Sequence, residues 1–75
     1  MKRNVIVLPG TKWQIPLVNK LKSRGYRVVV FDYYNNQPAY KYADEYCLVD
    51  ILDKERVYEL AEKYSAVAVI SDECD

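Results

Sequence analysis

The sequence predicts an α/β fold in which a four-stranded parallel sheet, ordered 3-2-1-4, carries helices on both faces. Two short runs, Val5–Leu8 and Val28–Phe31, are apolar throughout and mostly β-branched, and both are too short for typical helices. Strands without polar residues are typical of a parallel sheet that is covered on both sides. Amphipathic helical stretches lie between the strands, and right-handed crossovers then favour this strand order.

The stretch Asn4–Gln14 is the one around which the rest of the chain is arranged. Within it, Pro9-Gly10 breaks the first strand, and a helical stretch begins a few residues later. A strand that runs through a tight turn into a helix directs the free N–H groups of the helix N-terminus toward whatever binds there. The helix dipole adds about half a positive charge at the same place.

The first helix is expected over about residues 13–24. Thr11 and Gln14 have the spacing of a capping box, which would make Thr11 the N-cap. A helix start near Trp13 is preferred, because it places Pro16 in the first turn, where backbone N–H groups have no partner within the helix. Gly25 is expected just past the end of the helix.

The second strand, Arg27–Asp32, ends at the edge where open α/β sheets bind ligands. Residues 33–44 then form a loop, with one short helical turn over Ala39–Ala43. The mixed polarity of Glu45–Val49 indicates a third strand at the edge of the sheet.

The second helix is expected to begin after its N-cap, Asp53, and its apolar residues have helical spacing. Two side-chain pairs are expected to support it. Leu52 and Val57 have the spacing of a hydrophobic staple, and Glu59 and Lys63 have that of an ion pair on one helix face.

The last strand, Ala66–Ile70, contains no polar residue, which predicts a central position in the sheet. In the order 3-2-1-4, the turn after the first strand and the acidic segment Ser71–Asp75 share one crevice. Seven residues at these strand ends are candidates for substrate binding: Gly10, Thr11, Lys12, Trp13, Gln14, Asp32 and Asp72.

Each candidate also has an ordinary structural explanation. Gly10 is as consistent with a simple turn as with the approach of a ligand, Lys12 with a solvated cation, and Trp13 with packing at the helix start. Asp32 is placed to read a ribose hydroxyl, but the phosphate-binding glycine patterns are missing. The chain has no histidine and no nucleophile–base pair, so neither a catalytic set nor a metal site is predicted.

A group of tyrosines follows the second strand. Such rings can stack on a base, but half-buried tyrosines at a sheet edge or an interface are commoner and are the preferred interpretation. An exposed face of this kind also predicts self-association of so small a domain. The tyrosines concerned are Tyr33, Tyr34, Tyr40, Tyr42 and Tyr46.

The composition predicts one small domain, residues 1–75, and excludes several kinds of partner. Eleven basic and eleven acidic residues balance, whereas nucleic acids and anionic membranes call for a basic excess. No apolar run approaches the roughly 20 residues of a membrane-spanning helix, and no signal peptide is visible. A cytoplasmic protein is therefore expected, with Cys47 as a buried hydrophobe and Cys74 as a free thiol; a disulfide is the alternative.

These segments together resemble the N-terminal (pre-ATP-grasp) domain of ATP-grasp ligases, especially the carbamoyl-phosphate-synthetase-like and biotin-carboxylase-like members. The resemblance runs the whole length of the chain, in the correct order. It rests on Leu8-Pro9-Gly10-x-x-Trp13-Gln14-x-Pro16, on Gly25-Tyr26 before the strand that ends in Asp32, on Pro38-x-x-x-x-Ala43-Asp44-Glu45, on Val49-Asp50-Ile51-x-Asp53-Lys54-Glu55 and on Ser71-Asp72-x-x-Asp75.

The resemblance implies a Rossmann-like three-layer domain of a larger enzyme, which uses ATP and Mg²⁺ to form an acyl phosphate and then joins the acyl group to an amine. The ATP and metal ligands would lie in the later domains, which would be the partners of this chain. The chain itself, an excised domain or a truncated product, would form part of the acceptor-substrate crevice without being catalytic. A stand-alone flavodoxin-like or nucleotide-binding regulator and an oligomerisation module stay open as alternatives.

Overall fold

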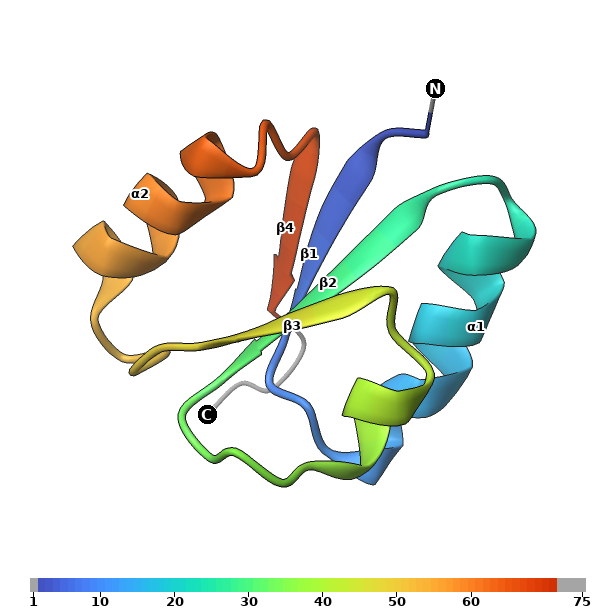
Figure 1. Ribbon diagram of the computed structural model, residues 1–75, viewed down its shortest axis with the longest axis horizontal. Helices are drawn as coiled ribbons and strands as arrows, with labels where there is room; N and C mark the ends of the chain where they lie inside the picture. The colour runs from blue at the N-terminus through green and yellow to red at the C-terminus, as the bar shows by residue number, and fades with distance from the viewer. Residues whose placement is uncertain (1, 72–75) are drawn as a thin grey trace.

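The computed structural model describes residues 2–71, and its four strands form one parallel sheet in the order β3-β2-β1-β4 (Figure 1). This confirms the predicted fold class and strand order. The elements are β1 (Asn4–Leu8), the 3₁₀ helix η1 (Lys12–Gln14), α1 (Ile15–Ser23), β2 (Arg27–Asp32), the 3₁₀ helix η2 (Pro38–Lys41), β3 (Glu45–Leu48), α2 (Lys54–Lys63) and β4 (Ala68–Ser71).

The two helices cover opposite faces of the sheet, α1 on one side and α2 on the other (Figure 1). Because successive strand residues point to opposite faces, each apolar strand supplies both cores. Under α1 the buried residues are Val5, Val7, Val18, Val28, Val30 and Ala39. Under α2 they are Ile6, Leu8, Val29, Phe31, Val49, Val57, Leu60 and Ala61.

The fourth strand lies at an edge of the sheet, so the prediction of a central strand was wrong. β4 pairs only with β1, in a register that places Val5 opposite Ala68 and Leu8 opposite Ser71. Val67 and Ala68 are exposed. An apolar run therefore shows neither that a strand is central in the sheet nor that its faces are buried.

The start of the first helix differs from both sequence alternatives. The 3₁₀ turn η1 comes first, and α1 begins at Ile15 with Pro16 in its first turn, where a proline is tolerated. Neither Thr11 nor Gln14 caps a helix through its side chain, so the capping box does not form. Gly25 follows the helix with a φ of +92°, as predicted for a glycine at that position.

The second helix has the predicted cap but not the predicted side-chain pairs. The Asp53 carboxylate accepts a hydrogen bond from the Arg56 N–H. Leu52 is 84% exposed, so it forms no staple; the turn in which Asp50 Oδ1 accepts the Leu52 N–H leaves that side chain in solvent. Glu59 pairs with Arg56, at 3.1 Å, instead of with Lys63.

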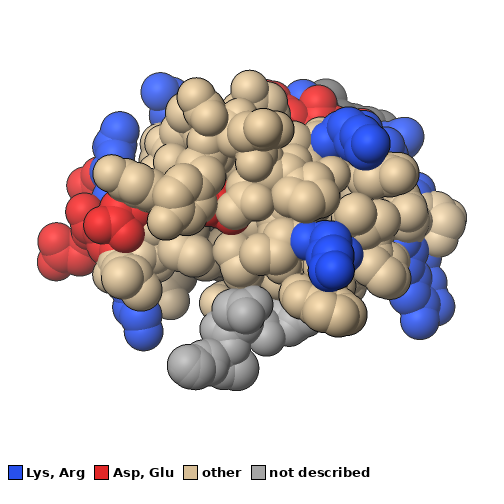
Figure 2. All heavy atoms as spheres, turned by 90° about the horizontal axis from the view of Figure 1, so that it is seen from below, with Lys and Arg blue, Asp and Glu red and all other residues tan. Residues whose placement is uncertain are grey.

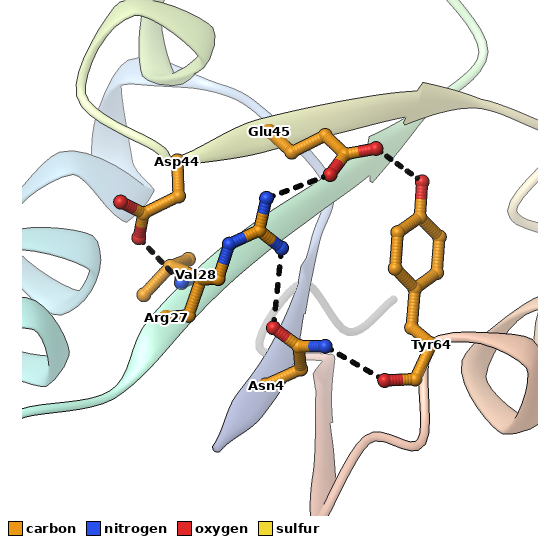
Figure 3. Close-up of polar contacts among 6 residues, drawn as sticks. All are labelled: Asn4, Arg27, Val28, Asp44, Glu45 and Tyr64. Carbon is orange, nitrogen blue, oxygen red and sulfur yellow. Dashed lines mark hydrogen bonds and ion pairs between the residues drawn. The ribbon is translucent and has the colours of Figure 1, made fainter. Parts of the chain in front are cut away.

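At the amino ends of the strands, four residues form a closed ring of hydrogen bonds (Figure 3). Arg27 donates to Asn4 Oδ1 at 3.2 Å and to Glu45 Oε1 at 2.9 Å. The Tyr64 hydroxyl donates to Glu45 Oε2 at 2.9 Å, and Asn4 Nδ2 donates to the Tyr64 carbonyl at 2.7 Å. The ring ties β1, β2 and β3 to the end of α2, at the edge opposite the candidate site.

This ring predicts a loss of stability at both extremes of pH. The hydrogen bond from Arg27, followed by that from Tyr64, lowers the pKa of Glu45. Glu45 therefore stabilises the fold fully above the ordinary pKa of glutamate, about 4.3. This stabilisation is lost as the pH falls toward the lowered pKa of Glu45. Burial, followed by the bond to Glu45, raises the pKa of Tyr64 to about 12, so that contribution is lost as the pH rises from about 10 to about 12.

Urea unfolding of the wild type and of Glu45→Gln from pH 3 to 7 tests the acid limb. The variant should show a smaller loss of unfolding free energy on acidification, because it lacks the carboxylate whose pKa is lowered. Glu62→Gln, an exposed glutamate on α2 outside the ring, should follow the wild type. Parallel curves for the wild type and Glu45→Gln would contradict the prediction.

Candidate functional site

The carboxyl ends of β1, β2 and β4 meet at the lower side of the molecule in Figure 1. Seen from that side, the middle of the surface is largely uncharged, with basic groups at both ends and a group of acidic residues at one end (Figure 2). Open parallel sheets bind ligands at this edge, because the loops that follow the strands converge there. The loops after β1, β2 and β3 are therefore the candidate site.

The Asp32 carboxylate joins the loop after β1 to the loop after β2. Its Oδ2 accepts the Gly10 N–H at 2.7 Å and the Gln37 side-chain amide at 3.0 Å, while Oδ1 accepts the Tyr34 N–H at 3.2 Å. Asp32 is only 3% exposed, and three N–H donors hold a buried carboxylate well. Asp32 thus positions both loops.

Gly10 occupies a space that would not hold a side chain. A Cβ atom there would lie 3.0 Å from Val30 Cγ1, 3.1 Å from Tyr40 Cε1 and 3.2 Å from Gln37 Cβ. The Gly10 carbonyl also accepts the Ala39 N–H at 3.0 Å. The glycine is therefore needed for the close approach of the two loops, which is one of the structural explanations that the sequence left open.

The residues after Gly10 divide into exposed and buried ones. Lys12 and Trp13 are exposed, with Lys12 Nζ 5.1 Å from the centre of the Trp13 ring; Trp13 is 75% exposed, so it does not pack at the helix start as expected. Gln14 is buried and donates to the Leu8 carbonyl at 3.2 Å. Within residues 2–71, Thr11 Oγ1 and Gln14 Oε1 are buried without a hydrogen-bond partner.

The backbone N–H groups at the two ends of the loop from Gly10 to Gln14 already have partners. The Gly10 N–H is bonded to Asp32, and the Gln14 N–H to the Thr11 carbonyl at 3.0 Å. A loop that satisfies its own donors leaves fewer of them for an anion. Of the three intervening residues, Lys12 and Trp13 form the exposed part of the loop.

A small hollow of about 130 Å³ lies beside the carboxyl ends of β1 and β4, where the sequence predicts a crevice shared by the turn after β1 and the segment Ser71–Asp75. Leu8 and Ser71 lie opposite each other in the two strands, and side chains around α2 complete the lining. None of the candidates from Gly10 to Gln14 lines this hollow. Asp72 lies outside the described residues, as do Glu73 and Asp75.

Asp32 instead lines a larger hollow, of about 420 Å³, at the ends of β2 and β3. Among its other lining residues, only the two tyrosines were considered from the sequence, as rings that can stack on a base. The rule that strand ends converge at one edge could also have found Asp50. These lining residues are Tyr33, Tyr34, Asp50, Ile51 and Leu52.

Four of the five tyrosines form two ring pairs, and Tyr42 belongs to neither. The Tyr40 and Tyr46 rings stack with centres 4.0 Å apart, and those of Tyr33 and Tyr34 meet edge to face at 5.4 Å. The Tyr40 hydroxyl donates to the Tyr34 carbonyl. Burial, followed by the negative charge of Asp32, raises the pKa of Tyr40 to about 12. Tyr40 is thus half-buried as expected, whereas the other four tyrosines, Tyr33, Tyr34, Tyr42 and Tyr46, are exposed.

Residues 2–71 contain no group of three His, Cys, Asp or Glu residues that could hold a metal ion. The same part of the chain has no helix of sufficient length and apolar character to cross a membrane. Cys47 is a free thiol that packs against the core under α2. It is half-buried, and not fully buried as expected. Cys74 lies outside the described residues.

The fold is similar to part of N5-carboxyaminoimidazole synthetase from Staphylococcus aureus, in a crystal structure complexed with ADP. The similarity covers 95% of this chain and 19% of that chain, with a TM-score of 0.78 and 19% sequence identity. That enzyme is an ATP-grasp ligase. The chain thus shares its fold with less than a fifth of the ligase. No family model matches the chain, and neither does any curated protein sequence.

Proposed function

We propose that this chain is the N-terminal, substrate-side domain of an ATP-grasp ligase that joins a carboxylate to an amine or a similar nucleophile. The observation that carries the proposal is the fold similarity to an ATP-grasp ligase over 95% of the chain. The sequence segments that resemble this superfamily support it, because two of them contain Gly10 and Asp32, which hold the carboxyl-edge loops together.

In this proposal the chain shapes one wall of an acceptor-substrate crevice and performs no chemistry by itself. Asp32 and Gly10 act as positioning residues, and the loop from Thr11 to Gln14, together with Asp72, contributes to the wall. The remaining domains of the ligase are the partners, and the cytoplasm is the expected location. A second copy of the chain is a further candidate partner, supported by the exposed apolar residues Val67 and Ala68 at the β4 edge.

The residues described here do not fit ATP or Mg²⁺. The turn after β1 lacks a glycine-rich phosphate loop, and its Gly10 N–H is already bonded to Asp32. No three potential metal-binding side chains lie together within residues 2–71. ATP and Mg²⁺ would therefore have to be held by other domains of the ligase.

The isolated chain is accordingly expected neither to bind ATP tightly nor to hydrolyse it. The negative charges of Asp32 and Asp50 at the carboxyl edge oppose the phosphates of the nucleotide, and no cation of the described residues is held beside them. Isothermal titration calorimetry with ATP, with and without Mg²⁺, measures this directly. A micromolar affinity would contradict the assignment of nucleotide binding to other domains and would favour the stand-alone nucleotide-binding regulator.

The reading frame in genomic DNA beyond the codon for Asp75 tests the proposal itself. A downstream segment with a glycine-rich lid and Glu and Asn metal ligands would support it. A frame that encodes no such domain, with none encoded beside it, would overturn it.

A further inference from the structure

The larger hollow at the carboxyl edge combines negative charge with exposed aromatic rings. It measures about 420 Å³, which is within the usual size of small-molecule sites. Its six lining residues come from the last residue of β2 and from the loops after β2 and β3. Asp32 and Asp50 supply two carboxylates, and no lysine or arginine lines it.

The charge of Asp32 is hydrogen-bonded but not neutralised. Its partners are two backbone N–H groups and the amide of Gln37, none of which carries a charge. The ion pairs among the described residues involve Glu45 and Glu59 instead. A buried carboxylate without a cation beside it favours any cation that enters the adjoining hollow.

The walls of the hollow suit a cation with an apolar stem. Tyr33 and Tyr34 are 63% and 64% exposed and meet edge to face, and aromatic faces attract ammonium groups within about 6 Å. Ile51 and the exposed Leu52 add apolar surface that a hydrocarbon stem can cover. One carboxylate oxygen of Asp50 accepts the Leu52 N–H, and the second has no partner within the described residues.

We infer that this hollow binds a primary ammonium group on a short apolar stem. The inference goes beyond the proposed function, because it rests on the hollow alone and holds whether or not the chain belongs to a ligase. An anion is disfavoured at this place by the same two carboxylates. The binding is expected to be weak, because the hollow is open to solvent and salt screens its charges.

Titrating the ¹⁵N-labelled chain with butylammonium chloride, and in parallel with 1-butanol, tests the inference. Butylammonium should shift the amide resonances of 33–34 and 50–52, with an effect that salt weakens, whereas the neutral alcohol of similar shape should shift them far less. Equal shifts with butylammonium and with 1-butanol would show that the hollow binds only the apolar stem, and would overturn the inference. Shifts of similar size on the acidic outer face of α2, around Glu55, Glu59 and Glu62, or none at all, would overturn the inference.

Two matched pairs of variants separate the local effect from net charge. Asp50→Asn removes one charge but keeps the acceptor for the Leu52 N–H, and should weaken butylammonium binding about two- to fivefold. Asp53→Asn makes the same change in charge three residues away and keeps a capping side chain, so it should leave binding unchanged. Tyr33→Leu should weaken binding, whereas Tyr58→Leu, an exposed tyrosine on α2, should not.

Equal weakening within either pair would overturn the inference, because it would leave only a general attraction to the surface.

A free amine and a lysine side chain of another protein present the same chemistry. Nα-acetyl-lysine methylamide, which carries the ammonium on a four-carbon stem with peptide groups attached, distinguishes the two sources. Tighter binding than butylammonium points to a lysine of a partner, and weaker binding to a free amine.

Discussion

Replacing Asp32 with alanine is expected to lower the free energy of unfolding by about 3 kcal/mol or more, because three hydrogen bonds to a charged acceptor are lost and the buried Gly10 N–H is left without a partner. A domain of this size has roughly 4–11 kcal/mol of stability in total. Such a loss is a large part of that total, so the variant should unfold at a clearly lower urea concentration than the wild type. Urea unfolding followed by circular dichroism measures the loss.

Two further variants identify the cause of that loss. Asp32→Asn keeps an oxygen that can accept the Gly10 N–H, so it should be clearly more stable than Asp32→Ala. Asp50→Asn removes a charge from the same hollow without touching the bonds between the loops, and should stay near the wild type. A midpoint for Asp32→Ala close to that of the wild type would show that the loops do not depend on this carboxylate.

Replacing Gly10 with alanine is expected to cost about 1–3 kcal/mol through overpacking. The added methyl group would lie 3.0 Å from Val30 Cγ1 and 3.1 Å from Tyr40 Cε1, and Val30 is fully buried in a strand, so it has little room to move. The φ angle of Gly10 is not positive, so steric overlap and not backbone strain is the expected cause. Unfolding free energies of the two proteins give the difference.

A double-mutant cycle with Val30→Ala tests that cause. Val30→Ala is itself destabilising, but it removes the nearest atom, so Gly10→Ala should cost less in that background than in the wild type. A matched cycle with Val29→Ala, a buried valine whose side chain belongs to the opposite core, should show no such coupling. The same cost of Gly10→Ala in all three backgrounds would contradict the steric explanation.

The sequence by itself was sufficient for the fold. The strand Arg27–Asp32 was predicted with the bounds that the structure shows, and Asp53 and Gly25 end up at the helix ends for which they were proposed. The strand order followed from apolar runs and right-handed crossovers. These features depend on the chain neighbours of each residue or on a general rule of chirality, both of which can be read along the sequence.

The site depended on tertiary structure. Leu52 has the spacing of a staple and Glu59 that of a pair with Lys63, but a local turn exposes the first and Arg56 binds the second. Asp32 was a candidate for a ligand, yet its oxygens bind the Gly10 N–H, 22 residues away in the chain, and two groups of its own loop. A polar side chain at a strand end bonds whichever donors the folded loops bring within reach. These partners are determined by the tertiary structure, so no periodic pattern in the sequence predicts them.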